Sequence, residues 1–282
     1  MPDPNVDANV SHQIYVERLA TTNANSIDGE LKALATYVRS RLAEEGRKIE
    51  SKAALNKLVA DVRNKFGSTY DTWVAGTGVY LNELSEYETE FQTKIINMQT
   101  VDEFDVVAPS AESTEREVRN TPMAIGANGG AVAVAALLGN FSKSETDKTL
   151  AVIKTGYYQG ERISDISASI TGTRANKYAD GVIASTKRNA KAVSRTSSDH
   201  VTNVAKSNVY KRNQKAVQGY ILTAVLDSKT SKTCRGLDDK EVLLSDDYQP
   251  RPPFHINCRT VMRPLLRDDL DRIKRAQRQT IG

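Results

Sequence analysis

The chain has 282 residues, of which 39% are hydrophobic and 26% are charged, and its formal net charge is +4. This balance suits a folded protein of one large domain or two ordinary ones and excludes an intrinsically disordered chain. The two cysteines are too few for a disulfide scaffold, so we expect a reducing compartment.

The amino terminus and the apolar runs predict neither a signal peptide nor a membrane span. The first residues, MPDPNVDANVSHQ, are acidic and lack the basic, apolar and small-residue order of a signal peptide. The longest nearly apolar run, Ala131 to Leu138, covers eight residues, whereas a helix needs about 20 to cross a bilayer. We therefore expect no export by that route and no membrane partner.

The first part of the chain predicts long helices, because no proline falls between residues 5 and 108. Apolar residues repeat at helical spacing in three stretches, and Gly46 is a suitable C-cap residue after the first. The three faces are Leu31, Leu34, Val38 and Leu42; Leu55, Leu58, Val59, Val62 and Phe66; and Tyr80, Leu84, Tyr87, Phe91, Ile95 and Met98. We predict an elongated, all-helical amino-terminal domain over residues 1–104.

The next segment, residues 105–140, predicts a linker. Its first part is polar, lacks periodicity and contains Pro109. The glycines of GANGGAVAVAALLGN lack the Lys-Ser or Lys-Thr pair and the GxGxxG spacing of phosphate-binding loops. We predict a flexible turn that leads into a buried helix of small residues.

Helical signals return after residue 140. In SKSE, Ser142 and Glu145 have the spacing of a capping box, which predicts a helix from about Lys143. Gly156 and Gly160 interrupt the pattern. The stretch ERISDISASITG then predicts a short helix that ends at Gly172, with its isoleucines at positions 163, 166 and 170 on one face.

Positive charge gathers in the second part of the chain. Up to Phe104, 11 basic residues stand against 16 acidic ones, a net charge of −5, whereas the remainder carries 28 against 19, a net +9. Residues 177–219 predict a mostly exposed basic helix with a thinner apolar seam of Val201, Val204, Ala205 and Val209. Such a surface attracts phosphates and carboxylates alike, so it would suit DNA or an acidic protein, although a solvated face without a partner is the alternative.

The carboxyl-terminal part predicts a few strands. YILTAVLDS, residues 220–228, has the β-branched and aromatic content of a strand, and KEVLL supplies a partner. The tail LRDDLDRIKRAQRQ predicts either a solvated helix or a basic contact surface, with Arg272, Lys274, Arg275 and Arg278. The fold class is therefore mainly α, with a helical amino-terminal domain followed by a carboxyl-terminal α+β module within residues 141–282.

Three metal-ligating residues fall in this module. Cys234 follows the predicted strand, and His255 and Cys258 lie after a Pro-rich turn. Zinc prefers thiolate and imidazole ligands, and a His-x-x-Cys spacing lets one turn supply two of them. A paired CxxC is missing, because position 237 is Leu237. Zinc, a disulfide between the two cysteines, and a metal-free hydrogen-bonded turn all remain open.

Two segments resemble the head morphogenesis minor capsid proteins of tailed phages, the group typified by protein F of phage Mu. LDSKTSKTCRGLDD resembles the Asp, Thr and Cys segment of that family, and PPFHINCRT resembles its Pro-Pro-x-His-x-x-Cys-Arg ending. The resemblance covers roughly residues 145–265. The signature residues carried over to this chain are Asp227, Thr233, Cys234, Pro252, Pro253, His255, Cys258 and Arg259.

The chain departs from the family pattern in two places. Leu237 and Thr260 stand where many relatives have additional cysteines. This departure weakens zinc as a shared requirement and favours a structural clasp, in which Asp227, His255 and Arg259 tie the strand to the Pro-rich turn. We expect these polar groups to be buried, and buried polar groups must satisfy one another, which fixes a unique local structure.

The resemblance implies a structural role rather than an enzyme. The expected protein is a minor head protein that lies inside the capsid near the portal, with host cytoplasm as its place of assembly. Its expected partners are the portal protein, other head proteins and, through non-specific electrostatics, the packaged DNA. A metal-dependent nuclease or toxin-like effector on the same domain is the alternative, with Asp227 or His255 holding an ion that activates water.

Overall fold

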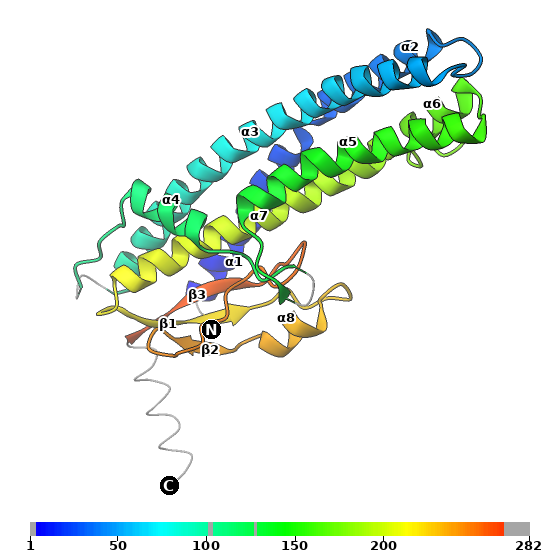
Figure 1. The fold of residues 1–282 in the computed structure, drawn as a ribbon. Helices are drawn as coiled ribbons and strands as arrows, with labels where there is room; N and C mark the ends of the chain where they lie inside the picture. Colours follow the sequence, from blue (N-terminus) through cyan, green and yellow to red (C-terminus); the bar gives the residue numbers. More distant parts are fainter. Residues whose placement is uncertain (1–3, 101–103, 127–128, 268–282) are drawn as a thin grey trace. The chain divides into compact units, whose positions relative to one another are not determined.

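The computed structural model describes residues 4–100, 104–126 and 129–267 (Figure 1). The described residues are mainly helical and end in a small antiparallel sheet, which confirms the predicted fold class. The helices are α1 (Pro4–Asn25), α2 (Asp28–Ala43), α3 (Lys52–Gln99), α4 (Ala111–Asn120), α5 (Val134–Gln159), α6 (Ile163–Thr171), α7 (Val182–Arg212) and α8 (Lys232–Leu237), and the strands are β1 (Val217–Thr223), β2 (Glu241–Leu243) and β3 (Val261–Leu266). Among the described helices, none combines the length and the apolar character that a bilayer crossing requires.

The chain forms two compact units, and each is assembled from segments that lie far apart in the sequence. Unit 1 comprises Met1–Leu19, Tyr80–Val134 and Arg195–Gly282, and unit 2 comprises Ala20–Val79 and Ala135–Ser194. These units differ from the predicted linear division at residues 104 and 140. The physical reason is helix length: α3 has 48 residues, which at about 1.5 Å per residue exceeds the diameter of a small domain. Long helices therefore contribute residues to both units.

Helix α3 joins two of the predicted helical faces into one helix. The buried stripe of its second part differs from the predicted one, because Tyr87 and Met98 are exposed. Glu88 and Gln92 are fully buried instead. Periodicity misses such positions because it counts only apolar residues, whereas Glu88 is buried together with Lys206.

The core of unit 2 contains an aromatic cluster and a buried carboxylate. Phe141 packs against Tyr70 and Trp73, with ring centroids 5.8 and 4.8 Å apart, respectively.

The predicted capping box is wrong, since α5 begins at Val134 and Ser142 lies inside the helix. The Ser142 hydroxyl donates to Asp71 (2.6 Å). Glu145 is buried and accepts hydrogen bonds from Thr186 and Asn189, both at 2.9 Å, and from Lys148 at 2.6 Å.

The predicted linker contains structure of its own. Helix α4 lies within it, and the Ser110 hydroxyl caps this helix by accepting from the backbone N–H of Ser113 (3.2 Å). The prediction of a buried small-residue helix is wrong, because Leu138 is the one buried residue between Ala131 and Leu138. Apolar atoms make up much of the surface of a folded protein, so an apolar run does not by itself require burial.

The short helix α6 matches its prediction. The isoleucines at 163, 166 and 170 are all buried, and the backbone turns at Gly172 with a φ of +85°. Gly156 does not end α5, because the helix continues to Gln159. A Cβ atom at this position would lie 2.4 Å from Cγ1 of Ile166, so the glycine permits close contact between α5 and α6.

The core of unit 1 forms around the sheet, whose strand order is β2-β1-β3 with both pairs antiparallel (Figure 1). Strands β1 and β2 lie at or near the predicted positions, whereas β3 was not predicted. The buried core cluster joins the sheet to the ends of α3 and α7. Its members are Ile96, Val209, Tyr210, Ala216, Val217, Tyr220, Leu222, Val242, Met262 and Leu266.

The prediction of a mostly exposed basic helix is wrong for the second part of α7, although its apolar seam is buried as expected at Val201, Val204 and Val209. The polar residues of the SSDH stretch, 197–200, are buried as well. Even Lys206 has an exposed fraction of only 1%. This part of α7 is therefore buried through small polar side chains as well as apolar ones, and a count of apolar residues alone does not reveal that burial.

Candidate functional site

The predicted signature residues meet where α8 faces the loop that precedes β3. Ser231 caps α8 by accepting from the backbone N–H of Cys234 (3.1 Å), which places this cysteine in the first turn. The backbone N–H of Cys258 donates to the carbonyl of His255 (3.1 Å). This tight turn, with Asn257 at a φ of 58°, brings the His255 and Cys258 side chains toward Cys234.

Three potential ligand atoms converge at this point. The Cys234 Sγ atom lies 3.1 Å from Nε2 of His255 and 3.7 Å from Sγ of Cys258. All three atoms lie within 4.8 Å of one another. Both cysteines are buried and do not form a disulfide, while His255 is partly exposed. We call these three residues the Cys-His-Cys cluster.

The remaining signature residues surround this cluster. The Arg259 guanidinium binds Asp227 with two parallel hydrogen bonds of 2.7 Å each. The pair is partly exposed, at 28% for Arg259 and 40% for Asp227, so it is not the buried pair that the clasp hypothesis assumed. Pro252 and Pro253 are buried, whereas Thr233 is exposed.

Electrostatics separate the two thiols. The hydrogen bond from Cys258 lowers the pKa of Cys234 to about 4, although burial acts in the opposite direction. The same bond, together with burial, raises the pKa of Cys258. The hydrogen bond between the two thiols therefore favours the thiolate on Cys234 and the proton on Cys258. Hydrogen bonding to Arg259 holds the pKa of Asp227 below its usual range.

The site depends on α7 and β1 residues that the motif did not reveal. The backbone N–H of Asn257 donates to Oγ1 of Thr196 (2.9 Å), and that of Met262 donates to Oδ1 of Asn203 (3.2 Å). The Tyr220 hydroxyl donates to the carbonyl of Pro250 (2.9 Å). One signal was present in the sequence: Lys and Arg become sparse between Thr196 and Ala205, although the helix is basic on either side.

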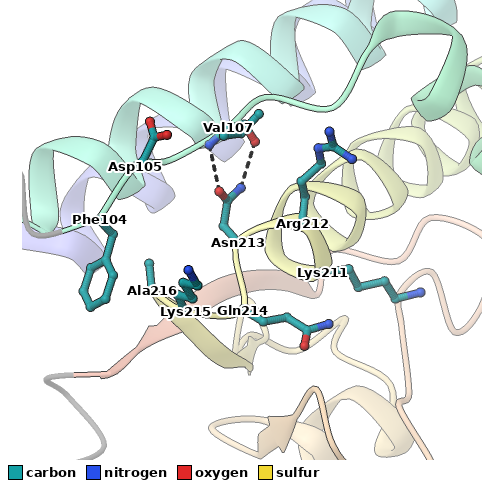
Figure 2. A pocket seen from close by; sticks show the side chains of 9 residues that line it. All are labelled: Phe104, Asp105, Val107, Lys211, Arg212, Asn213, Gln214, Lys215 and Ala216. Carbon is teal, nitrogen blue, oxygen red and sulfur yellow. Dashed lines mark hydrogen bonds between the residues drawn. The ribbon is translucent and has the colours of Figure 1, made fainter.

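A second candidate surface lies at the end of α7. A pocket of about 550 Å³ is lined by Phe104, Asp105, Val107, Lys211, Arg212, Asn213, Gln214, Lys215 and Ala216. Asn213 fixes its wall by bonding both the N–H and the carbonyl of Val107, at 2.8 and 2.9 Å. Figure 2 shows that the Lys211, Arg212 and Lys215 side chains do not converge on one point. This arrangement suits an extended anionic partner better than a single small anion.

The predicted basic surface is only partly visible. Lys211, Arg212 and Lys215 belong to the predicted stretch 177–219, and we call them the α7 basic cluster. The four predicted tail residues, Arg272, Lys274, Arg275 and Arg278, lie outside the described residues.

Comparison with known proteins supports the resemblance. Residues 147–263 match the family model described as phage Mu protein F like protein, a span that includes the Cys-His-Cys cluster together with Asp227 and Arg259. The match confirms the predicted resemblance over this segment, which is less than half of the chain. Searches of curated proteins and of solved structures gave no significant match.

Proposed function

We propose that this chain, with its phage Mu protein F-like segment, is a structural minor head protein of a tailed phage. It acts in capsid assembly at or near the portal, inside the capsid, and its basic surface contacts an acidic portal face or the packaged DNA. The family match over residues 147–263 is the observation that carries this proposal.

Two features of unit 1 support a docking role. The loop before β3 is bonded to α7, β1 and α8 at separate points, which makes it a rigid surface rather than a mobile one. The α7 basic cluster adds positive charge at the end of a buried helix, where long cationic side chains reach solvent and attract anionic groups.

The resemblance to phage Mu protein F supports a structural role rather than a catalytic one.

The decisive experiment is mass spectrometry of purified procapsids and virions, combined with a pull-down on purified portal protein. We expect the chain at low copy number in both particles and retained by the portal. Presence in infected-cell lysate but in neither particle would overturn the proposal. Incubating purified protein with plasmid DNA and added Mg²⁺, Mn²⁺ or Zn²⁺ tests the nuclease alternative, for which we expect no cleavage.

A further inference from the structure

We propose that Cys234, His255 and Cys258 bind one zinc ion through three protein ligands, with the fourth coordination position open to water. This inference is independent of the proposed head function. The zinc ion would connect the first turn of α8 to the loop before β3.

The spacing of the two sulfur atoms fits a tetrahedral ion. A Zn–S bond of about 2.3 Å and a tetrahedral angle give a sulfur–sulfur distance of about 3.75 Å. The measured distance between the Sγ atoms is 3.7 Å. It is much longer than the roughly 2.05 Å of a disulfide. The two sulfur atoms therefore already stand where a zinc ion needs them.

The imidazole lies close enough to complete the site. Zn–S and Zn–N bonds of about 2.3 and 2.05 Å give an S–N edge of about 3.55 Å. The Cys234 Sγ atom and the His255 Nε2 atom are 3.1 Å apart, and all three ligand atoms lie within 4.8 Å of one another. His255 is partly exposed, so its ring has room to move to the position that the ion needs.

The environment of His255 also favours metal binding. Its Nδ1 atom lies 2.9 Å from the carbonyl oxygen of Ile256. A carbonyl oxygen accepts only, so Nδ1 carries the proton and Nε2 presents a lone pair toward the two sulfur atoms. Imidazole ligands of zinc are commonly held in this way by a backbone carbonyl.

The fourth position lies in a small pocket rather than at a protein ligand. This pocket has a volume of about 20 Å³ and is lined in part by Thr230, Ser231, Arg259 and Thr260 together with Cys234 and His255. Such a space holds about one water molecule. Leu237, which occupies the CxxC position, packs against the core of unit 1 and leaves the fourth position to solvent. Three protein ligands with one open position distinguish this site from closed structural zinc sites.

Metal content of the full-length, reduced protein is the first test. After dialysis against Zn²⁺ and removal of loosely bound ion, elemental analysis should find one zinc per chain in the wild type. The variants Cys234→Ser and His255→Ala should retain far less, whereas Lys232→Ala, at an exposed position two residues before Cys234, should match the wild type. Zinc retention by the ligand variants equal to that of the wild type would overturn the proposal.

Cobalt substitution keeps the test decisive if a ligand variant fails to fold, because it uses the wild type alone. The Co²⁺-loaded protein should show intense visible bands of tetrahedral cobalt and a thiolate-to-cobalt charge-transfer band. Added azide should shift the visible bands, since it displaces the water. Weak octahedral bands without charge transfer would exclude the site, and tetrahedral bands that azide leaves unchanged would exclude the open fourth position. Air oxidation that joins Cys234 and Cys258 in a disulfide equally fast with and without zinc would likewise contradict the proposal.

Discussion

Glu88 is a fully buried carboxylate in unit 1 and shows how single residues stabilise this fold. Its Oε2 atom lies 2.6 Å from Nε2 of His12, and its Oε1 atom accepts from Gln92 (2.9 Å) and lies 3.7 Å from Nζ of Lys206. Burial alone would raise the pKa of Glu88, but Lys206 and His12 outweigh it and lower the pKa below its ordinary value. The carboxylate is thus ionised in the fold.

Glu88→Gln should destabilise the protein by about 3–5 kcal/mol at neutral pH, because it leaves the Lys206 ammonium buried without its counter-charge. Urea unfolding followed by circular dichroism measures this difference. Since the folded pKa is depressed, the contribution of Glu88 is present above the unfolded pKa of about 4.3 and is lost as the pH falls through the lower folded value. The difference between variant and wild type should therefore shrink in acid.

Glu90→Gln is the matched control, because Glu90 is exposed on the same helix. We expect a change within about 0.5 kcal/mol, as for other surface substitutions. Equal effects of the two substitutions would show that the buried network contributes nothing beyond general charge.

Asp199 presents the opposite case. It is 3% exposed, burial raises its pKa well above the ordinary value, and its Oδ2 atom has no hydrogen-bond partner among the described residues. A raised folded pKa means that stability is lost as the pH rises above the unfolded value of about 3.9. Asp199→Asn does not titrate, so it should gain stability relative to the wild type as the pH rises from about 4.5 to about 7.5. Urea titrations at several pH values check this, and a constant difference would contradict it.

At the residue scale, the sequence predicts the residues of the Cys-His-Cys cluster better than it predicts the residues that hold its loop in place by hydrogen bonds. Cys234, His255 and Cys258 are rare residue types in a recognisable motif, so their meeting could be anticipated. Thr196 and Asn203 were missed because serine, threonine and asparagine are equally frequent on solvated surfaces. Only the three-dimensional packing distinguishes a buried polar face from an exposed one.

At the element scale, the contact between α5 and α6 depends on Gly156. A methyl group there would lie 2.4 and 2.7 Å from Cγ1 and Cδ1 of Ile166, which is fully buried. Gly156→Ala should therefore destabilise unit 2 by about 1–3 kcal/mol through overpacking, although alanine is the better helix former. Thermal unfolding monitored by circular dichroism measures the effect.

Gly139→Ala supplies the matched control within the same helix. Its added Cβ would meet nothing within 4 Å, so the higher helix propensity of alanine should stabilise the protein by about 0.5–1 kcal/mol. The two substitutions should thus have opposite signs. A stabilising Gly156→Ala would show that α6 can move away from α5 at little cost.

Helices that bury apolar side chains could be predicted from the sequence, whereas the burial of polar side chains could not. Helices α2 and α6 follow clear apolar periodicity, and Gly172 marks the end of α6 as expected. In α7, Ser197 and Ser198 are buried although their sequence suggests solvent. Strand β3 was missed because Pro264 and Arg263 interrupt its apolar pattern, yet it pairs with β1 over its full length.

At the scale of the whole molecule, the chain order does not give the order of the compact units. Unit 1 collects residues from both ends and from the middle of the chain. The acidic first part and the basic second part of the sequence are therefore not two separate domains. Charge counted along the chain cannot locate a binding surface, which has to be tested by substitution at named positions.

The α7 basic cluster provides that test. Replacing Lys211, Arg212 and Lys215 with Gln should weaken binding to duplex DNA. The fall of log affinity with log salt concentration should also become less steep, by about 0.9 for each phosphate that the protein no longer neutralises. The quadruple variant Arg272→Gln, Lys274→Gln, Arg275→Gln and Arg278→Gln is the comparison, because it removes positive charge from the tail instead. Fluorescence anisotropy over a range of salt concentrations measures both variants.

The same two variants separate DNA from the portal as the partner. If the α7 basic cluster contacts DNA, the triple variant should lose affinity for DNA while portal pull-down is unchanged. If it contacts an acidic portal face, retention by the portal and incorporation into procapsids should fall instead. Lys211, Arg212 and Lys215 are exposed, so the fold of the triple variant should persist, and an unchanged melting temperature would verify this. If the triple variant binds both DNA and the portal as tightly as the wild type at low and high salt, the α7 basic cluster has no part in the proposed function.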